Sequence, residues 1–417
     1  MTPQIKQRIE KIQRGEVPEG YKKTKAGVIP SEWELHPLSK HLTESRIPGT
    51  NGAVAKKLTV KLWNKGVFEK REVHEGSEST TYYKRKAGQL IYSKLDFLNC
   101  AFGIIPDHLN GYESTQDLPC FDINDVDPYY LLTYVTQRNF YTHFGMIADG
   151  GRKARRVGPE DMLSFPLIYP SLPEQKKIAE ILSAQDKLIA LKEKLIEEKK
   201  RQKKALMQQL LTGKKRLPGF SGEWKKQKMS DILCERKEEN KDQSLRICSV
   251  AVNSGVVDQR EHLGKSMAAS DTSNYNVVHY GDIVYTKSPT GAFPYGIVKQ
   301  SQLTENVAVS PLYGVYEPTS YEIGYLLNEY FMYPNNANGY LLPIINKGAK
   351  NTINISNATF ITPSLYLPTN FEEIKKLVQI FKVANKEIEI LRKDLDQEKQ
   401  KKKALMQLLL TGIVRVN

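Results

Sequence analysis

Two segments of the sequence place a hydroxyl side chain and a lysine directly after a short apolar run. They are GQLIYSK, residues 88–94, and GDIVYTK, residues 281–287. The apolar residues predict a strand, and a hydroxyl and an ammonium group at its end can bind phosphate oxygens and base edges. The glycine- and proline-rich SPTGAFPYG that follows the second segment predicts a shaped loop. The candidate contacts are Ser93, Lys94, Thr286, Lys287 and Thr290.

Two further clusters combine basic side chains with glycine. GGRKARR, residues 150–156, carries four cations, and NKGAKN, residues 346–351, is its weaker counterpart. Arginine can hold phosphate or read guanine through its bidentate fork. A single surface lysine is more often only solvated, but the recurrence of both kinds of cluster at corresponding places favours binding. The candidates are Arg152, Lys153, Arg155 and Arg156 in the first cluster and Lys347, Lys350 and Asn351 in the second.

The sequence contains no recognisable catalytic pattern. It has no G-x-x-x-x-G-K-[ST] phosphate loop, no G-x-G-x-x-G after a strand and no H-E-x-x-H. DPYY, residues 127–130, is one residue away from the Asp-Pro-Pro-Tyr of amino-methyltransferases, but no glycine-rich cofactor loop accompanies it. We favour the purely structural alternative, in which a helix starts near Pro128. We therefore expect no catalysis by this chain alone and no cofactor bound to it.

Composition points to a basic, multidomain, cytoplasmic protein. A chain of 417 residues is too long for a single hydrophobic core, which indicates two or more domains. The formal net charge of +14 suits a polyanionic partner. No apolar run approaches the ~20 residues that span a bilayer, and the charged N-terminus lacks the apolar centre of a signal peptide. The four cysteines form no C-x-x-C pair, so no metal site is expected.

The segments that must position the candidate contacts occur twice in the sequence. KKALMQQLLTG ends at Gly213 and KKALMQLLLTG ends at Gly412, with ten of eleven positions identical and an offset of 199 residues. At the same offset EQKKIAEIL, from residue 174, faces EIKKLVQIF, from residue 373. VIPSEW, residues 28–33, likewise resembles LPGFSGEW, residues 217–224. Repetition at so long a period indicates a duplicated scaffold.

Each copy of the longest repeat predicts a helix of almost forty residues. Both stretches are free of internal glycine and proline and rich in good helix formers. Apolar residues recur at spacings of 3 and 4, which predicts a narrow seam against one partner helix, the other copy. Pro173 and Asn370 can open the two helices, and the glycines can end them. The predicted packing residues are Ile181, Leu188, Leu191 and Leu195 in the first helix and Phe381, Ile388, Leu391 and Leu395 in the second.

The chain order is head, long helix, head, long helix. We expect residues 1–172 to form the N-terminal segment and first head, 173–213 the first helix, 214–370 the second head and 371–417 the second helix. Short strands rich in Val, Ile, Tyr and Thr between glycine- and proline-containing loops predict an α+β fold in each head. Apart from the framework motifs the two heads barely resemble each other.

These motifs resemble the specificity subunit of type I restriction–modification systems. The resemblance is carried by the PEQKKIAEIL-type helix start, the KKALMQ-LLTG helix end and the IPSEW-type segment, and it spans residues 28–412. It implies two target-recognition domains, mixed sheet with helices, separated by two long antiparallel coiled-coil helices in a pseudo-two-fold arrangement.

The resemblance also implies function and partners. Each head would bind one half of a bipartite, asymmetric site in double-stranded DNA, and the helix pair would set the spacer. Two methyltransferase subunits and motor-nuclease subunits would supply catalysis, with S-adenosylmethionine, ATP and Mg²⁺ bound to those partners. No membrane partner is implied.

Two alternatives from other classes remain. A coiled-coil scaffold whose heads bind proteins predicts salt-insensitive partner binding, whereas DNA binding weakens steeply with salt. A self-sufficient methyltransferase or nuclease predicts activity of the purified chain, against which the missing cofactor loop argues.

Overall fold

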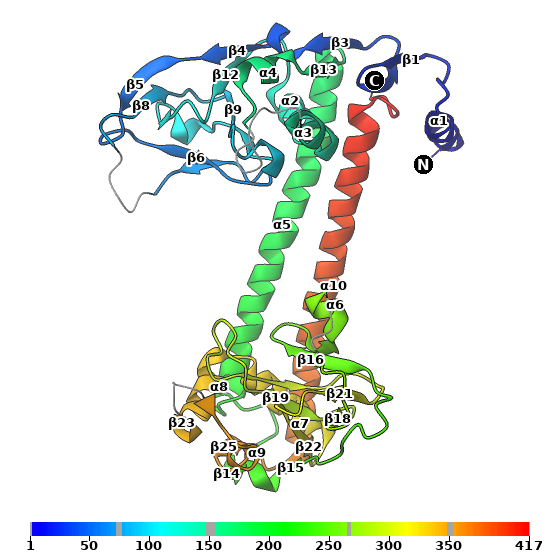
Figure 1. Cartoon of the computed structure of the whole chain (residues 1–417). Coiled ribbons are helices and arrows are strands. Elements are labelled where there is room, and N and C mark those ends of the chain that lie inside the picture. Colours follow the sequence, from blue (N-terminus) through cyan, green and yellow to red (C-terminus); the bar gives the residue numbers. More distant parts are fainter. Residues whose placement is uncertain (1, 72–76, 147–155, 265–267, 348–352, 417) are drawn as a thin grey trace. The chain divides into compact units, whose positions relative to one another are not determined.

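The structure is a computed structural model that describes residues 2–71, 77–146, 156–264, 268–347 and 353–416 (Figure 1). The chain forms two compact units, one of residues 1–193 with 393–417 and one of residues 194–392. Two long helices belong to both units: α5 (Leu172–Leu210) begins in the first unit and ends in the second, and α10 (Phe371–Leu410) does the reverse. None of the helices in the described ranges is long and apolar enough to cross a membrane.

The ends of the long helices follow from their sequences. The Asn370 side chain caps α10 by accepting a hydrogen bond from the backbone N–H of Glu372 (2.9 Å). Gly213 and Gly412 adopt φ angles of 69° and 71°, the left-handed conformation that ends a helix at glycine. A Cβ atom at Gly412 would also lie 2.5 Å from Cγ of Pro30, so only glycine fits there.

Within each unit α5 and α10 run side by side in opposite directions. In the first unit, Lys192 forms an ion pair with Asp394 (2.5 Å), and Asp186, six residues earlier on α5, pairs with Lys402 (2.5 Å) farther along α10. As the residue number decreases along α5, the number of its partner on α10 increases, so the two helices are antiparallel. In the second unit, Lys199 likewise pairs with Glu387 (2.6 Å).

The packing seam of α5 lies one residue later than the sequence predicted. Three of the four predicted residues are exposed: Leu191 is 64%, Leu195 39% and Ile181 37% exposed. Leu188 is half-buried. The buried seam of α5 keeps the spacing of 3 and 4 but includes polar side chains; among its residues are Ile178, Leu182, Gln185, Ile196, Lys203, Met207 and Leu210. In α10, by contrast, Phe381, Ile388 and Leu395 are buried and Leu391 is half-buried.

Polar residues take seam positions because their partners are brought by other elements. The Gln185 amide donates to the carboxylate of Glu398 (2.7 Å) on α10. Lys203, the first residue of the repeated KKALMQ peptide, is only 9% exposed and forms an ion pair with the buried Glu329 (3.0 Å). An apolar pattern alone does not reveal such positions.

In the described part of the first unit, antiparallel sheets are covered by short helices. The main sheet has the order β10-β9-β12-β4, a second sheet has the order β11-β8-β5, and three strand pairs join β1 to β2, β3 to β13 and β6 to β7. The strands are β1 (Tyr21–Thr24), β2 (Gly27–Pro30), β3 (Glu34–Pro37), β4 (Leu42–Ser45), β5 (Ile47–Asn51), β6 (Leu58–Val60), β7 (Val67–Glu69), β8 (Thr81–Lys84), β9 (Leu90–Tyr92), β10 (Phe102–Ile104), β11 (Glu113–Ser114), β12 (Cys120–Ile123) and β13 (Pro166–Tyr169). The helices are α1 (Pro3–Gln13), α2 (Pro128–Val135), α3 (Arg138–Gly145) and α4 (Pro159–Ser164).

The described part of the second unit has two four-stranded sheets, ordered β15-β22-β19-β20 and β17-β16-β21-β18, with pairs β14–β25 and β23–β24. The pairing is antiparallel except between β16 and β21. The strands are β14 (Lys225–Lys228), β15 (Leu233–Glu235), β16 (Ile247–Ala251), β17 (Gly255–Asp258), β18 (Asn276–Val278), β19 (Ile283–Thr286), β20 (Ile297–Gln300), β21 (Val307–Val309), β22 (Gly314–Pro318), β23 (Asn346–Lys347), β24 (Ile353–Asn354) and β25 (Ser364–Leu367). The helices are α6 (Gln259–Leu263), α7 (Tyr321–Phe331), α8 (Pro334–Leu341) and α9 (Asn357–Phe360).

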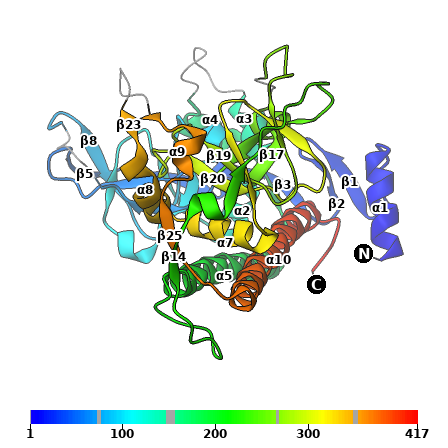
Figure 2. The same cartoon turned by 90° about the horizontal axis from the view of Figure 1, so that it is seen from below.

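The ends of the repeated helices enter the cores of the heads. Met207, Leu210 and Leu211 at the end of α5 belong to the core of the second unit, whereas Leu409 and Leu410 at the end of α10 belong to that of the first. In the second unit α7 packs against α10 (Figure 2), where the amide of Asn385 donates to Glu329 (2.8 Å). Each head is therefore built on the start of one long helix and the end of the other.

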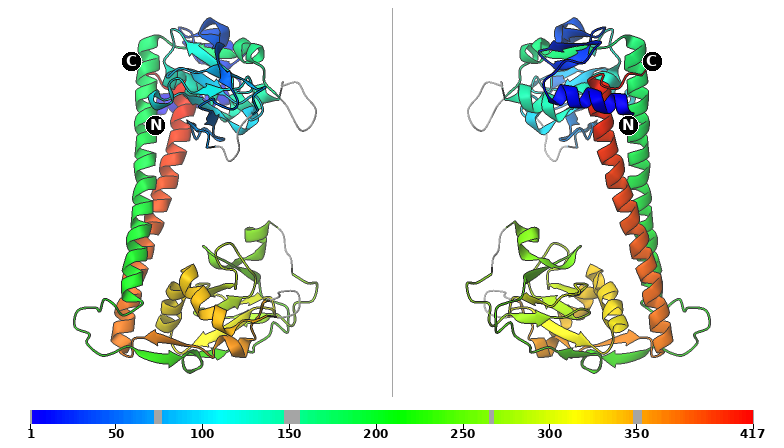
Figure 3. Two further views of the ribbon diagram at one scale, coloured as in Figure 1. Left: turned by 90° about the vertical axis from the view of Figure 1, so that its left-hand side faces the viewer. Right: turned by 90° about the vertical axis from the view of Figure 1, so that its right-hand side faces the viewer.

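The N-terminal helix belongs to the first unit only. Figure 3 shows α1 across the end of α10, where Arg8 hydrogen-bonds the carbonyl oxygen of Ile413. The hydroxyl of Tyr21 donates to the carbonyl oxygen of Gly412 (2.7 Å) and so joins strand β1 to the same helix end.

Each unit contains the same cluster of one arginine, one glutamate and one tryptophan at the start of a long helix. In the second unit Glu373, at the start of α10, accepts two hydrogen bonds from Arg216 (2.9 and 2.7 Å) and faces the indole N–H of Trp224 (3.4 Å). In the first unit Glu174, Arg415 and Trp33 repeat the arrangement at 2.6 to 3.0 Å. The arginine and glutamate positions are each 199 residues apart, the offset of the repeated helices.

Candidate nucleic-acid interface

In the first head the structure brings two of the predicted clusters together. The first cluster follows β9, where the buried Tyr92 donates its hydroxyl to the carbonyl oxygen of Val157 (3.0 Å). The backbone N–H of Val157 in turn donates to the carbonyl oxygen of Lys94 (3.2 Å). Arg156, one residue earlier, is exposed. The end of β9 and the end of the basic GGRKARR segment are thus neighbours, although about sixty residues separate them in sequence.

The two residues after β9 do not have the same role. Ser93 is only 6% exposed, and its hydroxyl accepts from the backbone N–H of Asp96 (3.1 Å) and donates to the Asp96 carboxylate (3.2 Å). It therefore stabilises the turn after the strand. Lys94 is half-buried and shares a small hollow of about 40 Å³ with Arg46.

Arg46 is a basic residue beside this site that the sequence patterns missed. Its side chain is 68% exposed and pairs with Glu44 (2.9 Å), and the hydrogen bond to that carboxylate raises the pKa of Arg46. Arg85 lies in the wall of the same hollow but is buried and donates to the carbonyl oxygen of Ser45 (2.7 Å). Arg85 therefore holds strands together, whereas Arg46 can reach a ligand.

In the second head the equivalent strand ends in a tightly shaped loop. Thr286 is 2% exposed, and its hydroxyl accepts from the backbone N–H of Ser288 (3.3 Å). Thr290 is exposed and pairs with the buried Phe293 through two backbone hydrogen bonds (3.0 and 2.8 Å). At Gly296, with a φ of 102°, an added Cβ would lie 2.0 Å from the carbonyl oxygen of Thr286. The loop is therefore held by its backbone, and Thr290 lies at its surface.

Lys287 is half-buried beside the loop. Burial lowers its pKa, and the nearby Glu235 partly opposes this shift. An ammonium group already partly removed from water gains strongly from an anionic partner. Lys287 is thus well placed to bind an anion.

Several predicted contacts lie outside the described residues. Arg152, Lys153 and Arg155 fall within 147–155, and Lys350 and Asn351 fall within 348–352. Lys347 lies in strand β23, which pairs with β24, but its side chain is not among those described. These residues remain predictions.

The DPYY segment starts a helix, as the sequence favoured. Asp127 caps α2 by accepting from the backbone N–H groups of Tyr129 and Tyr130 (both 2.9 Å). Both tyrosines are committed to the scaffold: Tyr130 donates to the carbonyl oxygen of Ile168 (2.8 Å), and Tyr129 hydrogen-bonds Asp186 on α5. In the described ranges no group of His, Cys, Asp or Glu side chains is arranged to hold a metal ion.

Comparisons with known proteins agree with this architecture. Residues 116–201 match the family model of the type I restriction modification DNA specificity domain. The chain is 26% identical over 219 residues to the putative MjaX type I restriction enzyme specificity subunit of Methanocaldococcus jannaschii. That match covers 46% of this chain and about half the length of the curated relative, 49%.

Solved structures share the fold over most of the chain. One comes from a study of complex assembly and conformational transition of the type I R-M system; it is 13% identical, with a TM-score of 0.54 over 93% of this chain and 99% of that one. The S subunit of the type I restriction–modification system of M. genitalium is 11% identical, with a TM-score of 0.53 over 90% of this chain and 96% of that one. Family model and relative both show a likeness to type I restriction–modification specificity subunits, and the solved structures show that this chain shares their fold.

Proposed function

We propose that this chain is the DNA-recognition subunit of a type I restriction–modification complex and has no catalytic activity of its own. Each head binds one half of a bipartite, asymmetric site in double-stranded DNA. The proposal rests on the contrast between the repeated helical framework and the differing loops of the two heads. The framework repeats down to the Arg–Glu–Trp cluster, whereas the loops at the strand ends differ between the heads. Two heads with different loops on one repeated helical framework suit a DNA site whose two halves differ in sequence.

The contacts that we assign to DNA lie at the ends of β9 and β19. In the first head they are Lys94, Arg156 and Arg46, with Arg152, Lys153 and Arg155 from the adjoining basic segment. In the second head they are Lys287 and Thr290, with Lys347, Lys350 and Asn351. Ser93 and Thr286, which are buried and hydrogen-bonded to their own loops, position these segments.

The partners follow from the same proposal. Two methyltransferase subunits, one for each repeat of the frame, supply S-adenosylmethionine-dependent methylation, and motor-nuclease subunits supply ATP- and Mg²⁺-dependent cleavage. The α5–α10 pair sets the spacer between the half-sites. The exposed leucines of α5, among them Leu191, leave apolar surface on the frame for a partner.

Methylome sequencing of the host with and without this gene tests the proposal. We expect one bipartite methylated motif to disappear when the gene is deleted. An unchanged set of methylated motifs would refute the DNA-recognition role. The scaffold alternative predicts no DNA affinity of the purified complex, and salt dependence of binding separates the two.

A further inference from the structure

A polar cleft of about 310 Å³ lies in the second unit, where strand β20 and helix α7 meet the turn between β16 and β17. Lys299 on β20 lines this cleft, together with Tyr325 and Asn328 on α7 and Asn385 on α10. The residues that line it all belong to the second unit. Its volume is at the lower end of the range for small-molecule sites, so it suits one small ligand.

Lys299 brings a buried positive charge to the cleft. The residue is 3% exposed, and within the described ranges its ammonium group forms no hydrogen bond or ion pair. Glu329 is the nearby carboxylate, but it accepts from the amide of Asn385 (2.8 Å) and already forms an ion pair with Lys203 (3.0 Å). A buried charge is costly unless an opposite charge pairs with it, so Lys299 favours an anion in the cleft.

The repeated framework shows that this charge is an addition. In the first unit Lys402 forms an ion pair with Asp186 (2.5 Å), one lysine for one carboxylate. At the offset of 199 residues these positions are Lys203 and Asn385, and Glu329 supplies the carboxylate instead. The second unit therefore keeps the charge balance of the first, and the lysine on β20 adds one positive charge to it.

Two neutral groups on α7 line the cleft as hydrogen-bond donors. The hydroxyl oxygen of Tyr325 accepts from the amide of Asn385 (2.8 Å), and the side-chain oxygen of Asn328 accepts from the backbone N–H of Gln300 (3.1 Å). Among the described residues, neither the O–H of Tyr325 nor the N–H₂ of Asn328 has an acceptor. With the ammonium group of Lys299, three donors from two elements match an oxyanion with three equivalent oxygens, a phosphate group.

The corresponding position in the first head is a glycine. Tyr285 of GDIVYTK pairs with the residue before Lys299, and Tyr92 of GQLIYSK pairs with the residue before Gly103. A Cβ atom at Gly103 would lie 2.5 Å from Cγ2 of Val67, so a side chain does not fit there. The charged cleft thus belongs to one head and is not part of the repeated framework.

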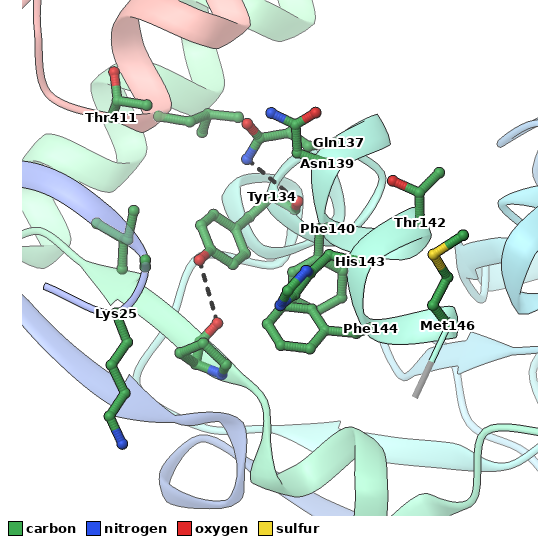
Figure 4. Close-up of a pocket in the computed structure, with 14 residues that line it drawn as sticks. Lys25, Tyr134, Gln137, Asn139, Phe140, Thr142, His143, Phe144, Met146 and Thr411 are labelled. Carbon is green, nitrogen blue, oxygen red and sulfur yellow. Dashed lines mark hydrogen bonds between the residues drawn. The ribbon is translucent and has the colours of Figure 1, made fainter. Parts of the chain in front are cut away.

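A larger cleft in the first unit has a different character. Its volume is about 610 Å³, and Figure 4 shows Phe140, His143 and Phe144 together on one side, with Lys25 at the margin. Lys25 is exposed, so water already solvates its charge. A largely aromatic wall and a solvated lysine do not select an anion, whereas the buried charge of Lys299 does.

We propose that the cleft in the second unit binds the phosphate group of a small, free phosphorylated molecule, held by Lys299, Tyr325 and Asn328. The bound phosphate joins β20 to α7. Through the hydrogen bonds and ion pairs of Asn385 and Lys203 it also connects them to α10 and α5, so it stabilises the second unit. This site goes beyond the proposed function and does not depend on it.

Thermal unfolding of the full chain, with inorganic phosphate as the probe, tests the site. At an ionic strength held constant with potassium chloride, we expect phosphate to raise the midpoint of unfolding in a saturable way. Lys299→Met removes the charge and should raise the half-saturating phosphate concentration at least about tenfold. A variant that responds to phosphate like the wild type would overturn the site. An equal response of the wild type to acetate would overturn its assignment to phosphate.

Asn328→Asp is a second variant that leaves the local hydrogen bond in place. Its carboxylate still accepts from the backbone N–H of Gln300, but it brings a negative charge into the cleft and repels phosphate. We expect it to lose the phosphate response as Lys299→Met does, and an unchanged response would count against the site. Lys225→Met makes the same charge change at an exposed position on β14 of the same unit and should keep the wild-type response.

The pH dependence gives a readout that a purely structural lysine would not change. The charged and titratable groups around Lys299 are Lys203 on α5, Glu329 and Tyr325 on α7 and, against the ring of Tyr325, Lys382 on α10. Burial lowers the pKa of Lys299 to about 8 and raises that of Tyr325 to about 12. A bound phosphate keeps Lys299 protonated to higher pH, so saturating phosphate should flatten the rise of the unfolding free energy above pH ~8. An equally steep rise with and without phosphate would contradict the contact.

DNA binding separates a free phosphate from a phosphate of the DNA backbone. Lys299 pairs with Val284 on β19 and so lies away from the loop that follows Thr286. We therefore expect Lys299→Met to leave the salt slope of DNA binding by the assembled complex unchanged. A slope reduced by about 0.9 would assign the phosphate to DNA and overturn the free ligand.

Discussion

Glu373→Gln tests whether the Arg–Glu–Trp cluster holds the second unit together. The Glu373 side chain is 2% exposed and accepts both hydrogen bonds from Arg216, whose own side chain is 25% exposed. Glutamine keeps the shape but removes the charge and turns an N–H₂ group toward an arginine donor. Trp224 loses part of its acceptor at the same time.

The magnitude follows from burial. Removing one partner of a fully buried ion pair costs about 3–5 kcal/mol. Because a quarter of the Arg216 side chain remains in contact with water, we expect a smaller loss of about 2–3 kcal/mol in the free energy of unfolding of the second unit. At 1.4 kcal/mol for each factor of ten, that corresponds to amide exchange about 30- to 150-fold faster.

Native-state hydrogen exchange followed by mass spectrometry resolves the effect by unit. Peptides from residues 216–228 and 371–380 report on the second unit, and peptides from residues 28–37 and 405–416 report on the first. We expect faster exchange only in the second unit. Glu372→Gln, at a neighbouring exposed position that pairs with Lys375, is the control and leaves both units unchanged.

The reasoning would be refuted if exchange in the second unit stayed within threefold of the wild type. A double-mutant cycle with Arg216→Met adds an independent criterion, since residues that act through each other are not additive. Additive effects of the two substitutions would show that the pair carries no coupling. Glu174→Gln should produce the mirror result, with faster exchange confined to the first unit.

Three further predictions concern charge, DNA contact and spacing. Burial lowers the pKa of Lys299 to about 8. Between pH ~8 and ~10.4 the unfolded chain therefore binds more protons than the folded chain, and the free energy of unfolding rises with pH. Urea unfolding of Lys299→Met should lack that rise, and a pH profile identical to that of the wild type would contradict the prediction. Lys94→Ala and Arg156→Ala should each weaken DNA binding of the assembled complex and reduce the slope of log K against log salt by about 0.9. Ser93→Ala removes a buried turn residue that positions the segment but contacts no phosphate, so it should leave that salt slope unchanged. One or two helical turns inserted into a long helix should change the spacer in methylation mapping without changing either half-site, and an unaltered spacer would refute the ruler role of the helices.

The helical frame could be predicted because its signals are local. Uninterrupted helix formers, Asn370 as a cap and the terminal glycines are each read within a few residues, and the structure has them as expected. The seam of α5 was misplaced for the opposite reason. Its true positions include Gln185 and Lys203, whose partners Glu398 and Glu329 come from distant parts of the chain. The apolar pattern instead selects Leu191, which is exposed.

The candidate site was predicted in part. The strand ends after GQLIYSK and GDIVYTK were recognisable from composition, and both segments form strands. Which of their polar residues face outward was not, because Ser93 and Thr286 are turned into their loops by hydrogen bonds. The duplicated Arg216 and Arg415 went unnoticed, although the common offset of 199 residues could have revealed them.

The sequence by itself determined that this protein is a duplication: two heads of α+β type, two long helices, and matching starts and stops for each. These features depend on residue spacing and on propensities that act along the chain. Tertiary structure alone decided which distant groups meet. It joins Lys94 to the segment that ends in Arg156, and Arg216 to Glu373, 157 residues away. Such contacts depend on how the elements pack in three dimensions, and no local pattern specifies that packing.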